Sequence, residues 1–189
     1  MLVLFLGHPT SPLVDYLLSV GEKVIATWDK IDPQTIETFK PDFLVSYGYR
    51  HILKEDVLGL LPDRAVNLHI AFLPWNRGAD PNFWSFVEHT PKGVTIHYLD
   101  KGVDTGDIIA QRCIPPFPND TFRTSYHRLQ YEMRRLFKEN WADIRIGKCN
   151  RSKQDKFGTF HYSKDKNRLM HMLTEGWDTP VSVFEDYAE

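Results

Sequence analysis

The chain has 189 residues, of which 42% are hydrophobic and 25% charged, which is the balance of a folded globular protein with one domain and a short appendage. A formal charge of −2 gives no general electrostatic reason to bind nucleic acid. The two cysteines, Cys113 and Cys149, lie far apart, which argues against a CxxC metal site and a disulfide framework, and no run approaches the roughly 20 apolar residues of a membrane span. We therefore expect a cytoplasmic protein without a nucleic-acid or membrane partner.

The first part of the chain predicts alternating strands and helices. Residues 2–6 are continuously apolar, as in a parallel strand buried on both faces, and Ser11 followed by proline predicts the start of a helix. Residues 24–26 and 43–45 predict two further strands with a short helix between them. This order implies right-handed crossovers and an α/β fold with a doubly wound, mostly parallel sheet, which binds ligands beyond the carboxyl ends of its strands.

The middle of the chain predicts two antiparallel strands and a long helix. A short strand over residues 65–68, a turn-rich loop and a helix near residues 81–88 precede strands over 94–99 and 108–114. Apolar residues then recur at spacings of three and four, which predicts an amphipathic helix through Phe122, Tyr126, Leu129, Met133, Leu136, Phe137, Trp141 and Ile144.

After Gly147 the composition shifts towards Lys, Asp and Ser, and a second helical pattern follows over residues 166–173. We expect residues 1–147 to form the main domain and residues 148–189 to form an appendage. The appendage either packs on the domain or forms an oligomer contact, such as that of a homodimer.

Asn67 and His69 stand two residues apart near the end of a predicted strand, so their side chains point to the same face. A carboxamide can donate to a developing oxyanion, and an imidazole can act as a general base or acid near neutral pH. The same spacing also suits a turn or a hydrogen-bonded structural histidine, and these residues alone do not separate the two interpretations.

The loop over residues 100–107 carries three carboxylates and two glycines between predicted strands. Its residues are typical of the turn between two strands of a β-hairpin, and the Asp104-Thr-Gly segment also resembles an aspartic protease loop. Such proteases need two of these loops facing each other, and the chain has one. The eight histidines contain no HExxH or Cys/His ligand spacing, so we expect no metal; His97, one strand from the loop, is a candidate supporting residue.

Two segments in this order resemble the signature of the folate-dependent formyltransferases, the family of glycinamide ribonucleotide, methionyl-tRNA and nucleotide-sugar formyltransferases. They are residues 66–78 (VNLHIAFLPWNRG) and residues 93–109 (GVTIHYLDKGVDTGDII). The resemblance covers roughly residues 1–145. It implies a Rossmann-like formyltransferase fold, 10-formyltetrahydrofolate as formyl donor, and a catalytic triad at Asn67, His69 and Asp104.

The implied roles follow the chemistry of formyl transfer to an amine. His69 handles the proton that the amine loses, Asn67 donates to the carbonyl oxygen as it becomes negative, and Asp104 orients His69 or a bridging water. The resemblance also places folate at two segments whose candidate contacts are Tyr47, His51, Ile52, Leu53, Leu99 and Lys101. Without the resemblance, Ile52 and Leu53 read as core residues.

Differences between this sequence and particular members of the family narrow the choice of the amine that accepts the formyl group. The residues after the long helix are neither strand-rich nor strongly basic, which disfavours a tRNA substrate, and the turn over residues 7–12 has two prolines where a phosphate-binding turn needs N–H donors. We therefore expect a nucleotide-linked amino sugar, such as a dTDP-4-amino-4,6-dideoxyhexose. Its candidate contacts are Thr10, Ser11, Trp75, Arg77 and Gly78, with His161, Tyr162 and Lys164 from the tail.

Three alternatives stay open at this point. The acceptor is another small amine, of the amino acid or glycinamide ribonucleotide type, or the chain is a folate-binding relative without catalysis. Trp75 and Trp84 are either ligand contacts or packing residues, since large aromatic side chains are mostly buried.

Overall fold

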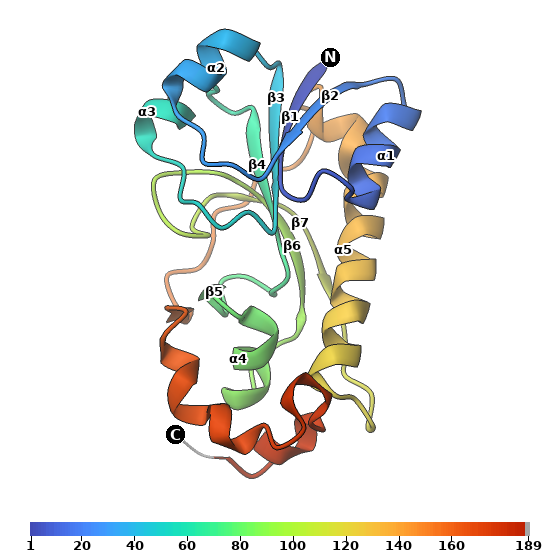
Figure 1. Cartoon of the computed structure of the whole chain (residues 1–189), viewed down its shortest axis with the longest axis vertical. Helices are drawn as coiled ribbons and strands as arrows, with labels where there is room; N and C mark the ends of the chain where they lie inside the picture. Colours follow the sequence, from blue (N-terminus) through green and yellow to red (C-terminus); the bar gives the residue numbers. More distant parts are fainter. Residues whose placement is uncertain (188–189) are drawn as a thin grey trace.

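The computed structural model describes residues 1–187 and is built on one six-stranded sheet with helices on both faces (Figure 1). The strand order is β2-β1-β3-β4-β6-β7. The strands are β1 (Leu2–Leu6), β2 (Lys23–Thr27), β3 (Phe43–Tyr47), β4 (Ala65–His69), β6 (Gly93–Tyr98) and β7 (Ile108–Cys113). β1 to β4 pair in parallel, and β6 and β7 add in antiparallel orientation. The predicted doubly wound, mostly parallel sheet is confirmed.

Two helices cover each face of the parallel half of the sheet. α1 and α5 lie on one side of the sheet in Figure 1, and α2 and α3 lie on the other, while α4 lies below the sheet. The helices are α1 (Pro12–Ser19), α2 (Pro33–Phe39), α3 (Glu55–Leu58), α4 (Pro81–Val87) and α5 (Phe122–Ile144). Within residues 1–187, no helix is long and apolar enough to cross a membrane.

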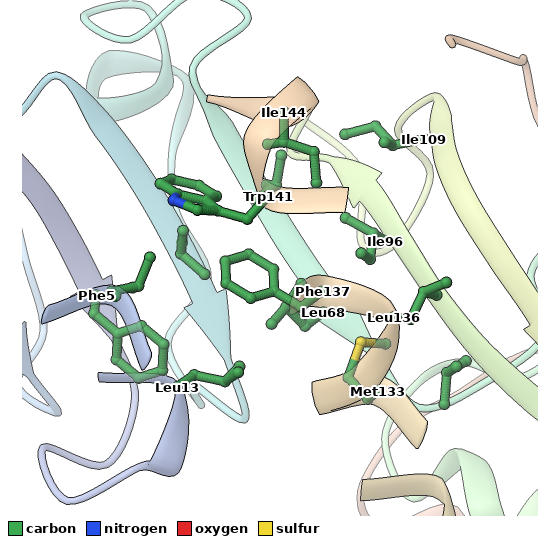
Figure 2. Packing of buried hydrophobic residues seen from close by; sticks show 14 of the residues in the cluster. Phe5, Leu13, Leu68, Ile96, Ile109, Met133, Leu136, Phe137, Trp141 and Ile144 are labelled. Atoms are coloured by element: carbon green, nitrogen blue, oxygen red, sulfur yellow. The ribbon is translucent and has the colours of Figure 1, made fainter. Parts of the chain in front are cut away.

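α5 supplies most of the core on its side of the sheet. Figure 2 shows Phe137 and Trp141 of α5 reaching across to side chains of the strands, among them Leu68 of β4 and Ile96 of β6. Both aromatic rings are almost fully buried, and their centroids lie 5.2 Å apart. The spacing of three and four residues that predicts this helix is therefore the spacing of the side chains that fill the core.

Strand alternation gives the two faces of the sheet different contents. Val66 and Leu68 of β4 belong to the core cluster under α1 and α5, whereas Ala65 belongs to the cluster under α2 and α3. Because alternate residues of a strand point to opposite faces, Asn67 and His69 lie on the same face as Ala65. Ala65 packs in the cluster with Val57 of α3, whereas the side chains of Asn67 and His69 further along β4 meet Asp104 from the loop between β6 and β7.

The tail (residues 148–187) leaves the end of α5, crosses beside the sheet and then packs against α4 (Figure 1). Its strand β8 (Phe160–His161) pairs in parallel with β5 (Arg77–Gly78), and three 3₁₀ helices follow, η1 (Asp165–Met172), η2 (Gly176–Asp178) and η3 (Val181–Phe184). The helix expected over residues 166–173 is thus a 3₁₀ helix. Leu169 is its one buried residue, so it lacks the apolar stripe that stabilises an α-helix.

Replacing Phe137 by alanine removes the centre of the main core, so we expect a loss of about 3–5 kcal/mol in the free energy of unfolding. Urea denaturation followed by circular dichroism measures this loss. Tyr131→Ala, on the exposed face of the same helix, is the matched control and should change stability by less than about 0.5 kcal/mol. Equal effects of the two substitutions would contradict the placement of the core.

Candidate active site

Three polar side chains of two neighbouring strands meet on the face of β4 that carries Ala65. Asn67 and His69 come from β4, and His97 of β6 lies opposite Asn67 in the antiparallel register. The two histidines are buried, with exposed fractions of 8% for His69 and 1% for His97. The sheet therefore presents one amide and two imidazoles side by side in a nearly dry position.

Asp104 reaches this group from the loop between β6 and β7. Its side chain is 11% exposed, and its backbone has a left-handed conformation with φ of 53°. One carboxylate oxygen, Oδ1, accepts a hydrogen bond of 3.0 Å from Asn67 Nδ2, and the other, Oδ2, accepts one of 2.9 Å from the backbone N–H of Gly78. The three residues of the expected triad are thus brought together.

Both histidines lie beside the Asp104 carboxylate. His69 Nδ1 is 3.6 Å from Oδ2, and His97 Nε2 is 3.4 Å from Oδ1. Burial alone would raise the pKa of Asp104, but the charge of His69, the hydrogen bond and charge of His97 and the Gly78 N–H together hold it well below its usual range. Asp104 is therefore a carboxylate at neutral pH.

The partners of the imidazoles fix which nitrogen carries a proton. His69 Nε2 lies 3.0 Å from the backbone oxygen of Asn76, and His97 Nδ1 lies 2.7 Å from that of Tyr98. A carbonyl oxygen only accepts, so each of these nitrogens donates. The remaining nitrogens, His69 Nδ1 and His97 Nε2, are the ones that face Asp104.

The amide of Asn67 is oriented by the same charges. Its Nδ2 donates to Asp104 Oδ1 at 3.0 Å and lies 3.3 Å from His97 Nε2. Turning the amide over would place its oxygen against the carboxylate of Asp104, which is repulsive. The second N–H group of the amide, the one that does not bond to Asp104, is therefore the group that Asn67 can offer to an oxyanion.

The expected acceptor contacts do not all face the triad. Ser11 is buried and caps α1 by accepting from the N–H of Leu13, and the hydroxyl of Thr10 lies 2.8 Å from His8 Nδ1. Trp75 is half-buried, and Arg77 donates through Nε and Nη2 to Gln154 of the tail. Gly78 is the member of the set that contacts the triad directly, through its N–H.

The expected folate contacts surround the end of β3 and the loop after β6. Leu53 and Leu99 belong to the apolar cluster on the face that carries the triad, and Ile52 beside them is 71% exposed. His51 and Lys101 are exposed as well, whereas Tyr47 packs on the opposite face and its hydroxyl contacts Gln130 of α5. Any role of Tyr47 in holding a ligand would thus pass through its backbone.

The tail residues suggested as acceptor contacts have different surroundings. His161 stacks on Trp84, with ring centroids 3.9 Å apart, and its Nε2 lies 2.9 Å from Glu88 Oε1. Trp84 is fully buried, so its ring packs the interface between α4 and the tail. Tyr162 and Lys164 are exposed. Among residues 1–187, no three His, Cys, Asp or Glu side chains are gathered as metal ligands would be.

Several site contacts lie outside the set that sequence reasoning identified. Asn76 holds His69 through its backbone oxygen, and Gln154 and Thr159 reach the same region from the tail. Asn76 acts through its backbone, which no side-chain pattern indicates, and Gln154 and Thr159 act on partners far along the chain.

Replacing Asp104 by asparagine tests the buried charge, since asparagine tolerates the same left-handed backbone. The depressed pKa of Asp104 stabilises the fold above the unfolded-state value of about 3.9, and this contribution is lost as the pH falls towards the folded-state pKa. We expect Asp104→Asn to lower the free energy of unfolding at pH 7 and the difference from the wild type to shrink below about pH 4. Urea denaturation across this pH range measures the difference in the free energy of unfolding. Asp143→Asn, on the exposed face of α5, is the control for the lost charge. A difference independent of pH would contradict this account.

The sequence and fold of this chain are similar to those of known proteins. The formyltransferase PseJ from Anoxybacillus kamchatkensis, solved with UDP-4,6-dideoxy-4-formamido-L-AltNAc and tetrahydrofolate, is 46% identical, with a TM-score of 0.96 and full coverage of both chains. A sugar N-formyltransferase from Shewanella sp FDAARGOS_354 is 24% identical, with a TM-score of 0.75 over 90% of this chain and 80% of that one, and shares the fold.

A third relative is matched over a shorter stretch. The methionyl-tRNA formyltransferase of Desulforamulus reducens is 36% identical over 107 residues, which are 56% of this chain and 34% of that protein. This chain therefore spans about a third of the length of that curated relative. The family described as formyl transferase matches residues 28–140, which is more than half of the chain. The chain belongs to the formyl transferase family, as the two signature segments predict.

Proposed function

We propose that the protein moves a formyl group from 10-formyltetrahydrofolate to the primary amine of a nucleotide-linked amino sugar. The observation that carries the proposal is the full-length likeness to a formyltransferase solved with tetrahydrofolate and a formamido sugar nucleotide. The buried group of Asn67, His69 and Asp104 supports it, because that group supplies the proton transfer and charge stabilisation that the reaction needs.

Formyl transfer sets two requirements for the site. A bond forms between the amine nitrogen and the formyl carbon, and the bond between that carbon and the folate nitrogen breaks. The amine loses a proton, the departing nitrogen takes one up, and the carbonyl oxygen carries negative charge in between. The protein must therefore hold a proton and stabilise an anion.

His69 is placed to hold the proton. Its Nε2–H is bonded to Asn76, so Nδ1 accepts the proton from the amine. Nδ1 lies 3.6 Å from Asp104 Oδ2, and an ionised carboxylate donates no proton, so the lone pair of Nδ1 can accept one. Once Nδ1 is protonated, the adjacent carboxylate stabilises the imidazolium, and the same proton can pass to the departing folate nitrogen.

Asn67 is placed to stabilise the oxyanion. The hydrogen bond to Asp104 holds its amide in one orientation, and the second N–H group of the amide donates to the negative oxygen as charge develops. Because the groups around it are already fixed, little reorganisation accompanies the reaction.

The donor is expected at the apolar rim formed by Ile52, Leu53 and Leu99. The exposed Ile52 beside the buried Leu53 and the half-buried Leu99 suits a flat heterocycle that covers an apolar side chain. We assign catalysis to residues 1–147 and regard residues 148–189 as an appendage to that domain. The two free cysteines of the described chain suit the reducing cytoplasm.

The acceptor class follows the full-length relative. Its bound sugar is linked to UDP and carries the formyl group on a 4-amino position, so a UDP-4-amino-4,6-dideoxy sugar is the first acceptor to test, ahead of its dTDP counterparts. The match to the methionyl-tRNA formyltransferase extends over 107 residues at 36% identity, and it supports the formyl-transfer chemistry without indicating the acceptor.

Incubation with 10-formyltetrahydrofolate and a panel of UDP- and dTDP-linked amino sugars tests the function directly. We expect tetrahydrofolate release together with gain of one formyl group by one sugar nucleotide, measured by mass spectrometry. His69→Ala should lower the rate by about 10²- to 10⁴-fold, whereas His127→Ala on exposed α5 should leave it unchanged. Folate binding without transfer to any sugar nucleotide would redirect the search to another small amine.

Removal of the proposed oxyanion donor gives a second test. Loss of one such donor costs about 2.7–4 kcal/mol of barrier, so Asn67→Ala should reduce kcat by roughly a hundredfold or more. Asn140→Ala on α5, the same substitution away from the site, is the control. A wild-type kcat in Asn67→Ala would remove Asn67 from the mechanism.

A further inference from the structure

Gln154 of the tail joins the two loops that carry the site. Its Nε2 donates to the backbone oxygens of Asp104 at 2.8 Å and of Gly106 at 2.7 Å. Its Oε1 accepts from Arg77 Nε at 3.0 Å and from Nη2 at 2.8 Å. Both N–H groups and both lone pairs of the amide are thus occupied by backbone or side chain of the protein.

The loop that Gln154 holds has an unfavourable backbone. Asp104 adopts φ of 53°, a left-handed conformation that is uncommon for residues with a side chain, although aspartate and asparagine tolerate it best. Gly106 is packed so closely that a Cβ there would lie 1.8 Å from the backbone oxygen of Tyr98. The two carbonyls that Gln154 binds flank this segment, so the tail fastens the loop at the residue that bears the carboxylate.

The other loop held by Gln154 contacts the same carboxylate. Arg77 precedes Gly78, whose N–H donates to Asp104 Oδ2. One residue earlier, Asn76 receives Nε2–H of His69, and its own N–H donates to Thr159 of the tail at 2.9 Å. The tail therefore holds Asp104 through its backbone oxygen, and it holds His69 indirectly, through the contact of Thr159 with Asn76.

We propose that Gln154 is a positioning residue for formyl transfer, which sets the placement of the Asp104 carboxylate relative to His69 by clamping the loop of Asp104 to that of Arg77. The inference rests on the proposed function, and it adds a residue of the tail to the site. A displacement of about 1 Å in such a site can cost about 10²-fold in rate.

Gln154→Met tests this role, because methionine keeps the length of the side chain and removes its donors and acceptors. We expect kcat to fall by about 10- to 100-fold, with KM for both substrates within about twofold of the wild type. The acid limb of the pH dependence of kcat should move to lower pH, because a carboxylate further from His69 stabilises its protonated form less. Hydrogen exchange of residues 99–107 should quicken while that of the sheet stays unchanged.

Gln34→Met on exposed α2 is the matched control and should leave kcat, its pH profile and the exchange of residues 99–107 unchanged. Gln154→Glu provides a second variant in case Gln154→Met does not fold. It keeps the pairing with Arg77 but offers no N–H to the backbone oxygens of Asp104 and Gly106, so its kcat should also fall. Wild-type kcat and pH profile in either folded variant overturn the positioning role. If the wild-type protein transfers no formyl group, the proposed function fails, and unchanged exchange of residues 99–107 in Gln154→Met then overturns the clamp.

Discussion

The charge of Asp104 lies almost out of reach of water, and the groups around it are arranged to hold it there. A buried carboxylate is costly unless hydrogen bonds and opposite charge replace its hydration. Asn67 and the N–H of Gly78 supply the hydrogen bonds. The imidazoles of His69 and His97 lie beside the carboxylate and supply opposite charge when they are protonated. The loop around Arg77, the loop of Asp104 and the polar end of β4 thus share one electrostatic centre, and each is oriented by it.

The sheet makes this centre compatible with a stable fold. Alternation along β4 directs Val66 and Leu68 into the core under α5, and Asn67 and His69 to the face where loops close. The apolar side of the strand is fully packed, so the polar side is held at a fixed spacing. A single strand therefore provides both stability and chemistry.

The sequence is sufficient to predict the sheet, the long helix and the grouping of Asn67, His69 and Asp104, because strand alternation, helical periodicity and two contiguous signature segments carry them. It is insufficient for the contacts that fasten the site. Arg77 meets Gln154 across 77 residues, and Asn76 meets Thr159 across 83. Such pairs follow from how loops close in space, and an amide or a hydroxyl in a polar tail has no local signature. For the same reason Arg77 reads as an anion-binding residue until its partner is seen.

The parallel pairing of β5 with β8 makes the site depend on a segment far along the chain. Joining residues 77–78 to residues 160–161 closes a long loop, whose entropic cost is met only after the sheet and α5 are in place. Residues 160–161 are synthesised after residues 77–78, so the contacts that the tail makes to the site can form only once the tail has been made. The stability of the core and the stability of the assembled site are therefore separate quantities. Transient detachment of the tail would disrupt the site while the core stays folded.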